Sequence, residues 1–267
     1  MFYLGNAQIF DQMKNALSLA CMLLAGILLS TSGFSQNSAP YNPDGNGDGM
    51  IGVTDLQDFL STYGLAFEAT ASTWSCGESM TYAGVDYSTV QIGDQCWFAE
   101  NLRTTTYLNG EAIPQNLSGG DWSSTTSGAM AFYNDGPAYG GLYNWYAVDD
   151  ARGLCPSGWH VPTDAEWTIL TDHLGGESVA GGQMKMDYGW YGGGNGTNSS
   201  GFSGLPGGYR YLNGFFYDAG NYGTWWSSSP NGSSAWSRAL LNSNEGFYRY
   251  LDYPMFGFSV RCVRDAE

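Results

Sequence analysis

Apolar and polar residues alternate in short stretches between positions 87 and 263, which predicts strands rather than long helices. Residues 87–92 alternate, Gly93 and Asp94 suit a turn, and residues 96–99 follow as a second apolar stretch. This order is typical of a β-hairpin. Further strands are expected near the end of the chain, at residues 225–229, 235–240 and 257–263.

Two segments carry the spacing of a helix. One is the apolar run of residues 141–148, which Gly153 follows as a stop signal. The other begins with a capping box, in which the Thr163 hydroxyl and the Glu166 carboxylate each satisfy a backbone N–H of the first turn. Apolar positions then share one face until Gly175 ends the helix, at Trp167, Leu170, Thr171 and Leu174.

Residues 44–55 match the spacing of a calcium loop. Oxygen-bearing side chains stand at the first, third, fifth and twelfth loop positions, and a backbone carbonyl serves at the seventh. The expected ligands are Asp44, Asn46, Asp48, the Met50 carbonyl and Asp55. Because Asp55 replaces the usual bidentate Glu, we expect weak binding, in the range of about 10⁻⁴–10⁻³ M.

One helix is expected after this loop and none before it. Residues 53–60 place apolar side chains on one face, whereas Pro40 and Pro43 interrupt the stretch before the loop. This EF-hand-like half-hand resembles one repeat of a dockerin. Because dockerins carry two repeats, we do not expect cohesin binding. We interpret residues 36–66 as a calcium-stabilised spacer and residues 67–75 as a linker.

The first residues carry the pattern of an export signal. Lys14 precedes an apolar run at residues 16–29, and small residues follow at residues 33–35. The run is shorter than a typical membrane span, and no other apolar run approaches its length. We therefore expect residues 1–35 to be a signal peptide, and the mature chain to be exported without a membrane span.

The charge balance excludes two classes of partner. The chain has 9 Lys and Arg residues against 25 Asp and Glu residues, which gives a formal net charge of −16. No basic stripe is available to neutralise phosphates. Binding to nucleic acid or to anionic lipid is therefore not expected.

Four cysteines lie beyond the signal, and an even number in an exported chain suggests two disulfides. Three pairings are open. We favour Cys76–Cys96, which closes a short hairpin-like segment, and Cys155–Cys262, which ties the start of the core to the last strand. If all four are paired, no thiolate is left for catalysis.

Five segments occur together in a characteristic order, at residues 90–102, 153–167, 204–210, 226–229 and 257–265. They resemble the Fibrobacter succinogenes major paralogous domain, which occurs in exported and surface proteins of the Fibrobacter–Bacteroidetes group. On this basis we place one domain at residues 76–267. The resemblance implies an α+β class and a C-type-lectin-like fold with two helices and short mixed sheets, related to formylglycine-generating enzymes.

No residue stands out as catalytic. His160 and His173 are the only histidines, and with oxidised cysteines they are too few for a zinc site. The chain has no nucleophile elbow, and no pair of carboxylates is singled out. The positions that match the reactive cysteines of formylglycine-generating enzymes are interpreted here as disulfide partners. Arg210 and Arg261 are expected to be structural, bonded to buried carboxylates or carbonyls.

Residues 187–226 combine many aromatic side chains with a glycine run at residues 192–196. The tripeptides with which C-type lectins hold calcium and sugar are absent from the chain, so calcium-mediated sugar capture is not expected. Aromatic rings can still stack on sugars. We expect Trp190, Tyr191 and Tyr217 to be exposed platforms on one face, and the glycine run to be an exposed, mobile loop.

The main hypothesis is an exported, non-enzymatic binding module of a Gram-negative bacterium, carried on a calcium-stabilised spacer. Its expected partner is a polysaccharide or a surface protein. Two alternatives stay open: an enzyme that acts on envelope or plant-type glycans, and a purely structural cell-surface protein.

Overall fold

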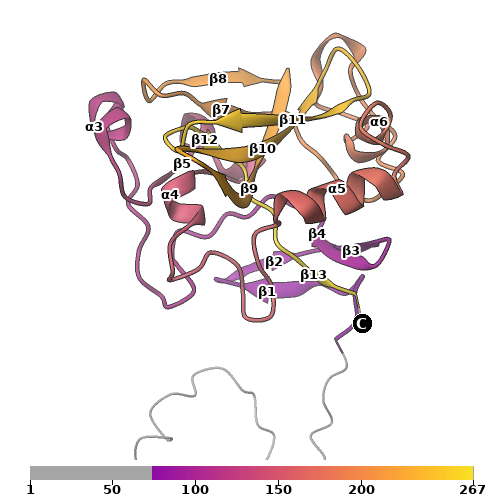
Figure 1. Ribbon diagram of the computed structural model, residues 1–267, viewed down its shortest axis with the longest axis horizontal. Helices are drawn as coiled ribbons and strands as arrows, with labels where there is room; N and C mark the ends of the chain where they lie inside the picture. The colour runs from indigo at the N-terminus through magenta and orange to yellow at the C-terminus, as the bar shows by residue number, and fades with distance from the viewer. Residues whose placement is uncertain (1–73, 267) are drawn as a thin grey trace, which may run out of the picture. The chain divides into compact units, whose positions relative to one another are not determined.

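The computed structural model describes residues 74–266, which form three β-sheets with short helices between them (Figure 1). The fold class is α+β, as the resemblance implied. The segments predicted to be a signal peptide, a calcium loop and a spacer lie outside the described residues.

The largest sheet contains eight strands in the order β11-β10-β9-β7-β12-β6-β5, with β8 paired to β7. Strands β7 and β9 are parallel, and the other neighbours are antiparallel. The strands are β5 (Met130–Phe132), β6 (Gly141–Asn144), β7 (Gly207–Arg210), β8 (Phe216–Ala219), β9 (Tyr222–Asn231), β10 (Ser234–Leu241), β11 (Phe247–Asp252) and β12 (Gly257–Phe258).

Two smaller sheets and seven short helices complete the part of the chain from residue 74 to residue 266. The small sheets are β13-β4-β3 and β1-β2, with β1 (Met80–Tyr82), β2 (Val85–Tyr87), β3 (Thr89–Ile92), β4 (Gln95–Phe98) and β13 (Val263–Asp265). The α-helices are α3 (Gly119–Ser124), α4 (Trp145–Val148), α5 (Asp164–His173) and α6 (Ala180–Met184). The 3₁₀ turns are η1 (Tyr133–Asp135), η2 (Pro137–Tyr139) and η3 (Tyr191–Gly193). None of the described helices is long and apolar enough to cross a membrane.

Helix α5 lies between the eight-stranded and the three-stranded sheet (Figure 1). Its predicted capping box is confirmed, because Thr163 Oγ1 accepts from Glu166 N at 3.2 Å and the Glu166 carboxylate accepts from Thr163 N at 2.7 Å. On the buried face, the Trp167 ring lies 4.7 Å from that of Trp97 in β4 and 5.5 Å from that of Phe247 in β11. One aromatic cluster therefore joins the helix to both sheets.

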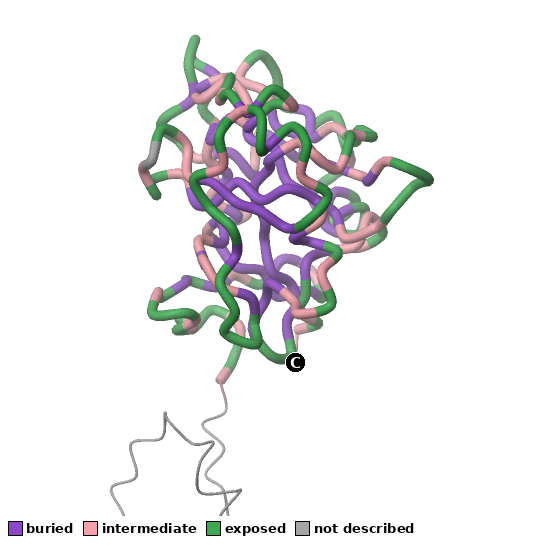
Figure 2. The backbone as a smooth tube through the Cα atoms, turned by 90° about the vertical axis from the view of Figure 1, so that its left-hand side faces the viewer, coloured by how far each residue is buried: buried purple, intermediate pink, exposed green. Residues whose placement is uncertain are grey.

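Buried residues follow the central strands, and exposed residues lie on the outer loops (Figure 2). One core cluster contains Phe98, Tyr143 and Trp226, and a second contains Trp167 and Trp225. These aromatic side chains are fully buried. Burial of each such ring stabilises the fold by about 1.5–3 kcal/mol, so aromatic residues supply the core of a chain that has few long helices.

Both predicted disulfides are formed, Cys76–Cys96 and Cys155–Cys262. The predicted hairpin is also confirmed, as β3 and β4. The second disulfide joins the loop before α5 to the segment that leads into β13, so it holds the last strand against the centre of the domain.

The helix predicted for residues 141–148 is confirmed only in its second half. Residues Gly141–Asn144 form β6, which pairs with β5 and β12, and only Trp145–Val148 are helical. The side chain of Asn144 accepts a hydrogen bond from Ala147 N and thereby starts α4. Tertiary pairing across the sheet overrides the apolar pattern at this place.

The strand predicted for residues 257–263 is divided in two. Gly257–Phe258 form β12 in the eight-stranded sheet, and Val263 begins β13 in the three-stranded sheet. The chain crosses from one sheet to the other between them, which a continuous apolar pattern does not reveal.

Candidate functional site

A groove of about 210 Å³ lies on one face of the eight-stranded sheet, and aromatic rings form most of its wall. We call it the aromatic groove. It is lined by Tyr209, Tyr211, Tyr222, Thr224, Ser237, Ala239, Tyr250, Asp252, Phe256 and Phe258.

The alternation of side chains along the strands separates this groove from the helix-covered face of the sheet. Ser237 pairs with Tyr250 in the register of β10 and β11, and both line the groove. Their neighbours Arg238 and Arg249 also pair, and both contact Asp164 of α5. One face of β10 and β11 is therefore covered by the helix, and the other carries the groove.

The rings of the groove support one another and stay partly exposed. The Tyr209 ring lies at the centre, 6.1 Å from Tyr217, 6.4 Å from Tyr222 and 6.1 Å from Phe256. Among the lining residues Tyr211 is 39% and Tyr250 is 45% exposed. Packed but accessible rings are suited to stacking on a ligand.

Two carboxylates lie beside these rings. Ser237 Oγ donates to Asp252 Oδ2 at 2.5 Å, and Oδ1 has no hydrogen-bond partner among residues 74–266. Burial raises the pKa of Asp252, although the Ser237 hydrogen bond opposes this shift. Tyr209 Oη donates to Asp218 Oδ2 at 3.0 Å. The groove thus offers oxygen acceptors next to aromatic faces.

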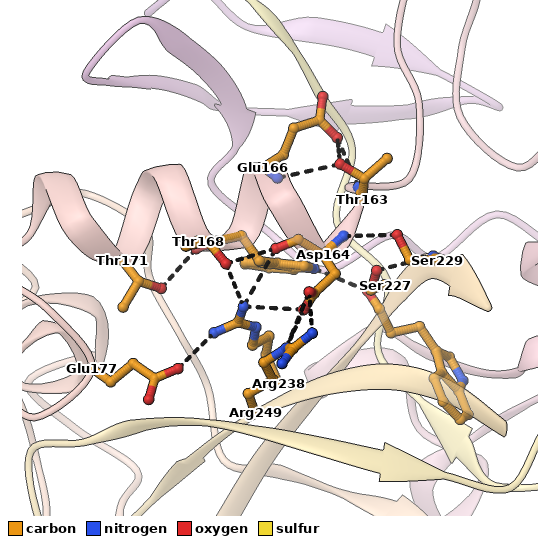
Figure 3. A network of polar contacts seen from close by, with 12 residues as sticks. Thr163, Asp164, Glu166, Thr168, Thr171, Glu177, Ser227, Ser229, Arg238 and Arg249 are labelled. Carbon is orange, nitrogen blue, oxygen red and sulfur yellow. Dashed lines mark hydrogen bonds and ion pairs between the residues drawn. The ribbon is translucent and has the colours of Figure 1, made fainter. Parts of the chain in front are cut away.

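The opposite face of the sheet holds a charged network whose members bond to one another (Figure 3). The buried Arg238 guanidinium lies 3.1 Å from Asp164 Oδ1, 3.2 Å from Glu177 Oε1 and 2.8 Å from Thr168 Oγ1. Arg249 Nη2 lies 2.7 Å from Asp164 Oδ2. Because its charges are paired with one another, we interpret this network as the attachment of α5 to the sheet.

His160, one of the two histidines, is bonded to α5. Its Nε2 lies 2.5 Å from Glu166 Oε1, and its backbone forms a bridge with Val263. The hydrogen bond with Glu166 raises the pKa of His160, and burial partly opposes this. Burial raises the pKa of Glu166, but hydrogen bonds from His160 and Thr163 lower it overall. The other histidine, His173, is exposed.

The three predicted stacking platforms do not share one environment. Trp190 is buried, with 4% exposure, and its Nε1 donates to Gly204 O at 3.1 Å, so the exposure expected for it was wrong. Tyr191 is 64% exposed and packs against Gly220. Tyr217 is 40% exposed, and its ring lies 6.1 Å from that of Tyr209, at the border of the aromatic groove.

The glycine run at residues 192–196 is only partly the open loop that was expected. Gly192 and Gly193 are exposed, but Gly194 is buried. A Cβ at Gly194 would come within 2.1 Å of Asn242 O, and one at Gly196 within 2.5 Å of Gly182 O. These two glycines permit close backbone packing.

Several residues of the groove escaped the sequence reasoning. Ser237, Tyr250, Asp252 and Phe256 lie after the aromatic segment of residues 187–226. Strand pairing brings the first three to it, and Phe256 lies in the loop between β11 and β12. The alternation of Tyr248, Tyr250 and Asp252 in β11 is the signal that was available.

Comparison with known proteins identifies a domain family. The Fibrobacter succinogenes major domain matches residues 90–264. This description names no activity or ligand. No curated protein and no solved structure matches the chain. The match covers more than half of the 267 residues, so the chain belongs to the Fibrobacter succinogenes major domain family.

Proposed function

We propose that the protein is an exported, non-enzymatic module that binds a polysaccharide through the aromatic groove. The observation that carries this proposal is the position of accessible Tyr rings beside the Asp252 carboxylate. Sugar rings present C–H faces that stack on aromatic rings, and their hydroxyl groups donate hydrogen bonds to carboxylate oxygens. A groove with both features suits a neutral glycan.

The remaining parts of the proposal concern architecture. Family membership supports a C-type-lectin-like fold for the domain at residues 76–267. The disulfides Cys76–Cys96 and Cys155–Cys262 support export, since such bonds form in oxidising compartments. Residues 36–66 would be a spacer held by calcium, and calorimetry on the mature chain with and without Asp48→Ala tests this site.

The proposal is tested by screening the mature protein on a glycan array and then measuring Kd for the best glycan by calorimetry. Tyr250→Ala and Tyr211→Ala each remove one exposed ring of the groove. Each should weaken binding by roughly five- to thirtyfold, which corresponds to a loss of about 1–2 kcal/mol of apolar contact.

Tyr191→Ala is the matched control, because Tyr191 is more exposed than either groove residue and does not line the groove. Its Kd should equal that of the wild type. If only Tyr191→Ala loses glycan affinity, the binding site is instead the surface near Gly220. Turnover of the glycan would favour the enzyme alternative, and no glycan binding would favour a structural role.

A further inference from the structure

A second cavity, of about 260 Å³, lies between three segments that are distant in sequence, residues 88–103, 138–140 and 186–205. It shares no lining residue with the aromatic groove. We call it the Asn101 pocket. It is smaller than the pockets of roughly 300–1,000 Å³ that hold drug-sized ligands, so it suits a ligand of one small ring.

The floor of this pocket is held in one shape by hydrogen bonds. Asn101 is 6% exposed, and its Nδ2 donates to Tyr139 O at 2.8 Å. Its Oδ1 accepts from Trp225 Nε1 at 2.8 Å and from Arg261 Nε at 2.7 Å. Gly140 lies against it with φ +84°, and a Cβ there would come within 2.5 Å of Asn101 Cβ.

A buried positive charge lies directly beneath this floor. Arg261 is 0% exposed and, as predicted, is bonded to carbonyl oxygens, those of Phe98, Phe202 and Ser203. The described residues give it no ion-pair partner. Burial lowers the pKa of Arg261 to about 9, so it stays charged at neutral pH. Because the low dielectric of the interior strengthens its field, an anion in the pocket would be favoured.

A second arginine lies on the wall of the pocket and is incompletely bonded. The Arg103 Nη2 lies 3.5 Å from Glu100 Oε2, which is long for an ion pair between partly exposed side chains. The Arg103 Nε is shielded from solvent and has no hydrogen-bond partner within residues 74–266. The guanidinium fork matches a carboxylate, which can accept two parallel hydrogen bonds from it.

We propose that the Asn101 pocket binds the carboxylate of a single hexuronic acid unit. The carboxylate would engage Arg103 above the charge of Arg261, and the Glu100 carboxylate and Ser88 hydroxyl would accept hydrogen bonds from ring hydroxyls. The net charge of −16 disfavours a polyuronate chain, whereas one charged unit on a neutral glycan fits. The inference does not depend on the aromatic groove.

The probe for this site is glucuronic acid, with glucose and acetate as comparisons, added to the isotope-labelled mature protein and followed by NMR. Glucuronic acid should shift the side-chain amide signals of Asn101, and glucose should not at the same concentration. Arg103→Gln should weaken glucuronic acid binding by about tenfold or more, since a charge-assisted contact is lost. Glu100→Gln should tighten it, because glutamine keeps an acceptor oxygen for the sugar hydroxyls and removes a negative charge that competes for Arg103.

Arg152→Gln is the matched control. Arg152 is as exposed as Arg103, at 36% against 35%, and also lies over a Tyr ring. The Arg152→Gln variant should bind glucuronic acid with the same affinity as the wild type. Equal binding of glucose, unchanged affinity in Arg103→Gln, or shifts away from Asn101 would each overturn the proposal. Tighter binding of a peptide C-terminus than of glucuronic acid would overturn the sugar assignment.

Discussion

At the scale of single residues, the hydrogen bond between His160 and Glu166 couples a loop to the first turn of α5. Each partner is shifted towards its charged form. Because the pKa of His160 is raised in the folded state, its bond to Glu166 stabilises the fold fully below pH 6.5, the usual pKa of histidine. This stabilisation is lost as pH rises through the pKa of His160 in the folded state. Because the pKa of Glu166 is lowered in the folded state, its charged form stabilises the fold fully above pH 4.5, the usual pKa of glutamate. This stabilisation is lost as pH falls through the pKa of Glu166 in the folded state.

We therefore expect the coupling between these side chains to be largest between pH 4.5 and 6.5. A double-mutant cycle of His160→Gln and Glu166→Gln, measured by urea denaturation at about pH 5.5 and about pH 8.5, isolates it. Glutamine keeps the acceptor that caps the helix. The coupling free energy should be smaller at the higher pH, and an equal value at both would contradict a charged pair.

Residue types also limit what could be predicted of the site. Trp190 and Tyr191 are neighbours in an aromatic segment, yet one is buried and the other exposed. The difference arises from Gly204 O, which accepts from the Trp190 indole, and no local pattern contains that contact. Arg261, in contrast, has the role expected for a buried arginine in a chain with few charges.

At the scale of elements, structure that depends on residues close together in sequence was predicted correctly, and structure that depends on pairing with distant segments was not. The start of α5 was predictable because Thr163 and Glu166 are three positions apart and complete the cap between themselves. Residues 141–144 looked helical because their partners, β5 and β12, are far away along the chain. The aromatic groove was missed for the same reason, since it forms only when β11 joins β10.

The cap of α5 gives a prediction at this scale. Thr163→Ala removes the acceptor of Glu166 N and should lower the free energy of unfolding by about 1 kcal/mol, within a range of roughly 0.5–2 kcal/mol. Urea denaturation measures this change. Thr126→Ala is the control, because Thr126 is exposed and no hydrogen bond of its side chain is found among the described residues, so it should change stability by less than about 0.5 kcal/mol.

The cap prediction fails if Thr163→Ala unfolds at the same urea concentration as its control. In that case packing of Trp167 against both sheets, rather than the cap, would determine the stability of α5.

At the scale of the whole molecule, the two disulfides close loops of very different length, with sequence separations of 20 and 107 residues. A longer closed loop restricts the unfolded chain more. Replacing both Cys155 and Cys262 with Ala should lower the free energy of unfolding by about 5 kcal/mol, and the same change at Cys76 and Cys96 by about 3 kcal/mol.

Denaturation of the two double variants, each with the other disulfide intact, compares these losses directly. The reverse order of stability would show that contacts in the native state, and not the restriction of the unfolded chain, set the effect of these bonds.

The two ends of the described domain meet. The Arg264 guanidinium lies 5.2 Å from the Trp74 ring, beside the three-stranded sheet, where Figure 1 shows the chain entering and leaving. A domain with adjoining ends can be spliced into a surface loop of a host protein without forcing that loop apart. Because both ends lie at one place, copies of the domain can also follow one another along a chain, each connected to it on the same side.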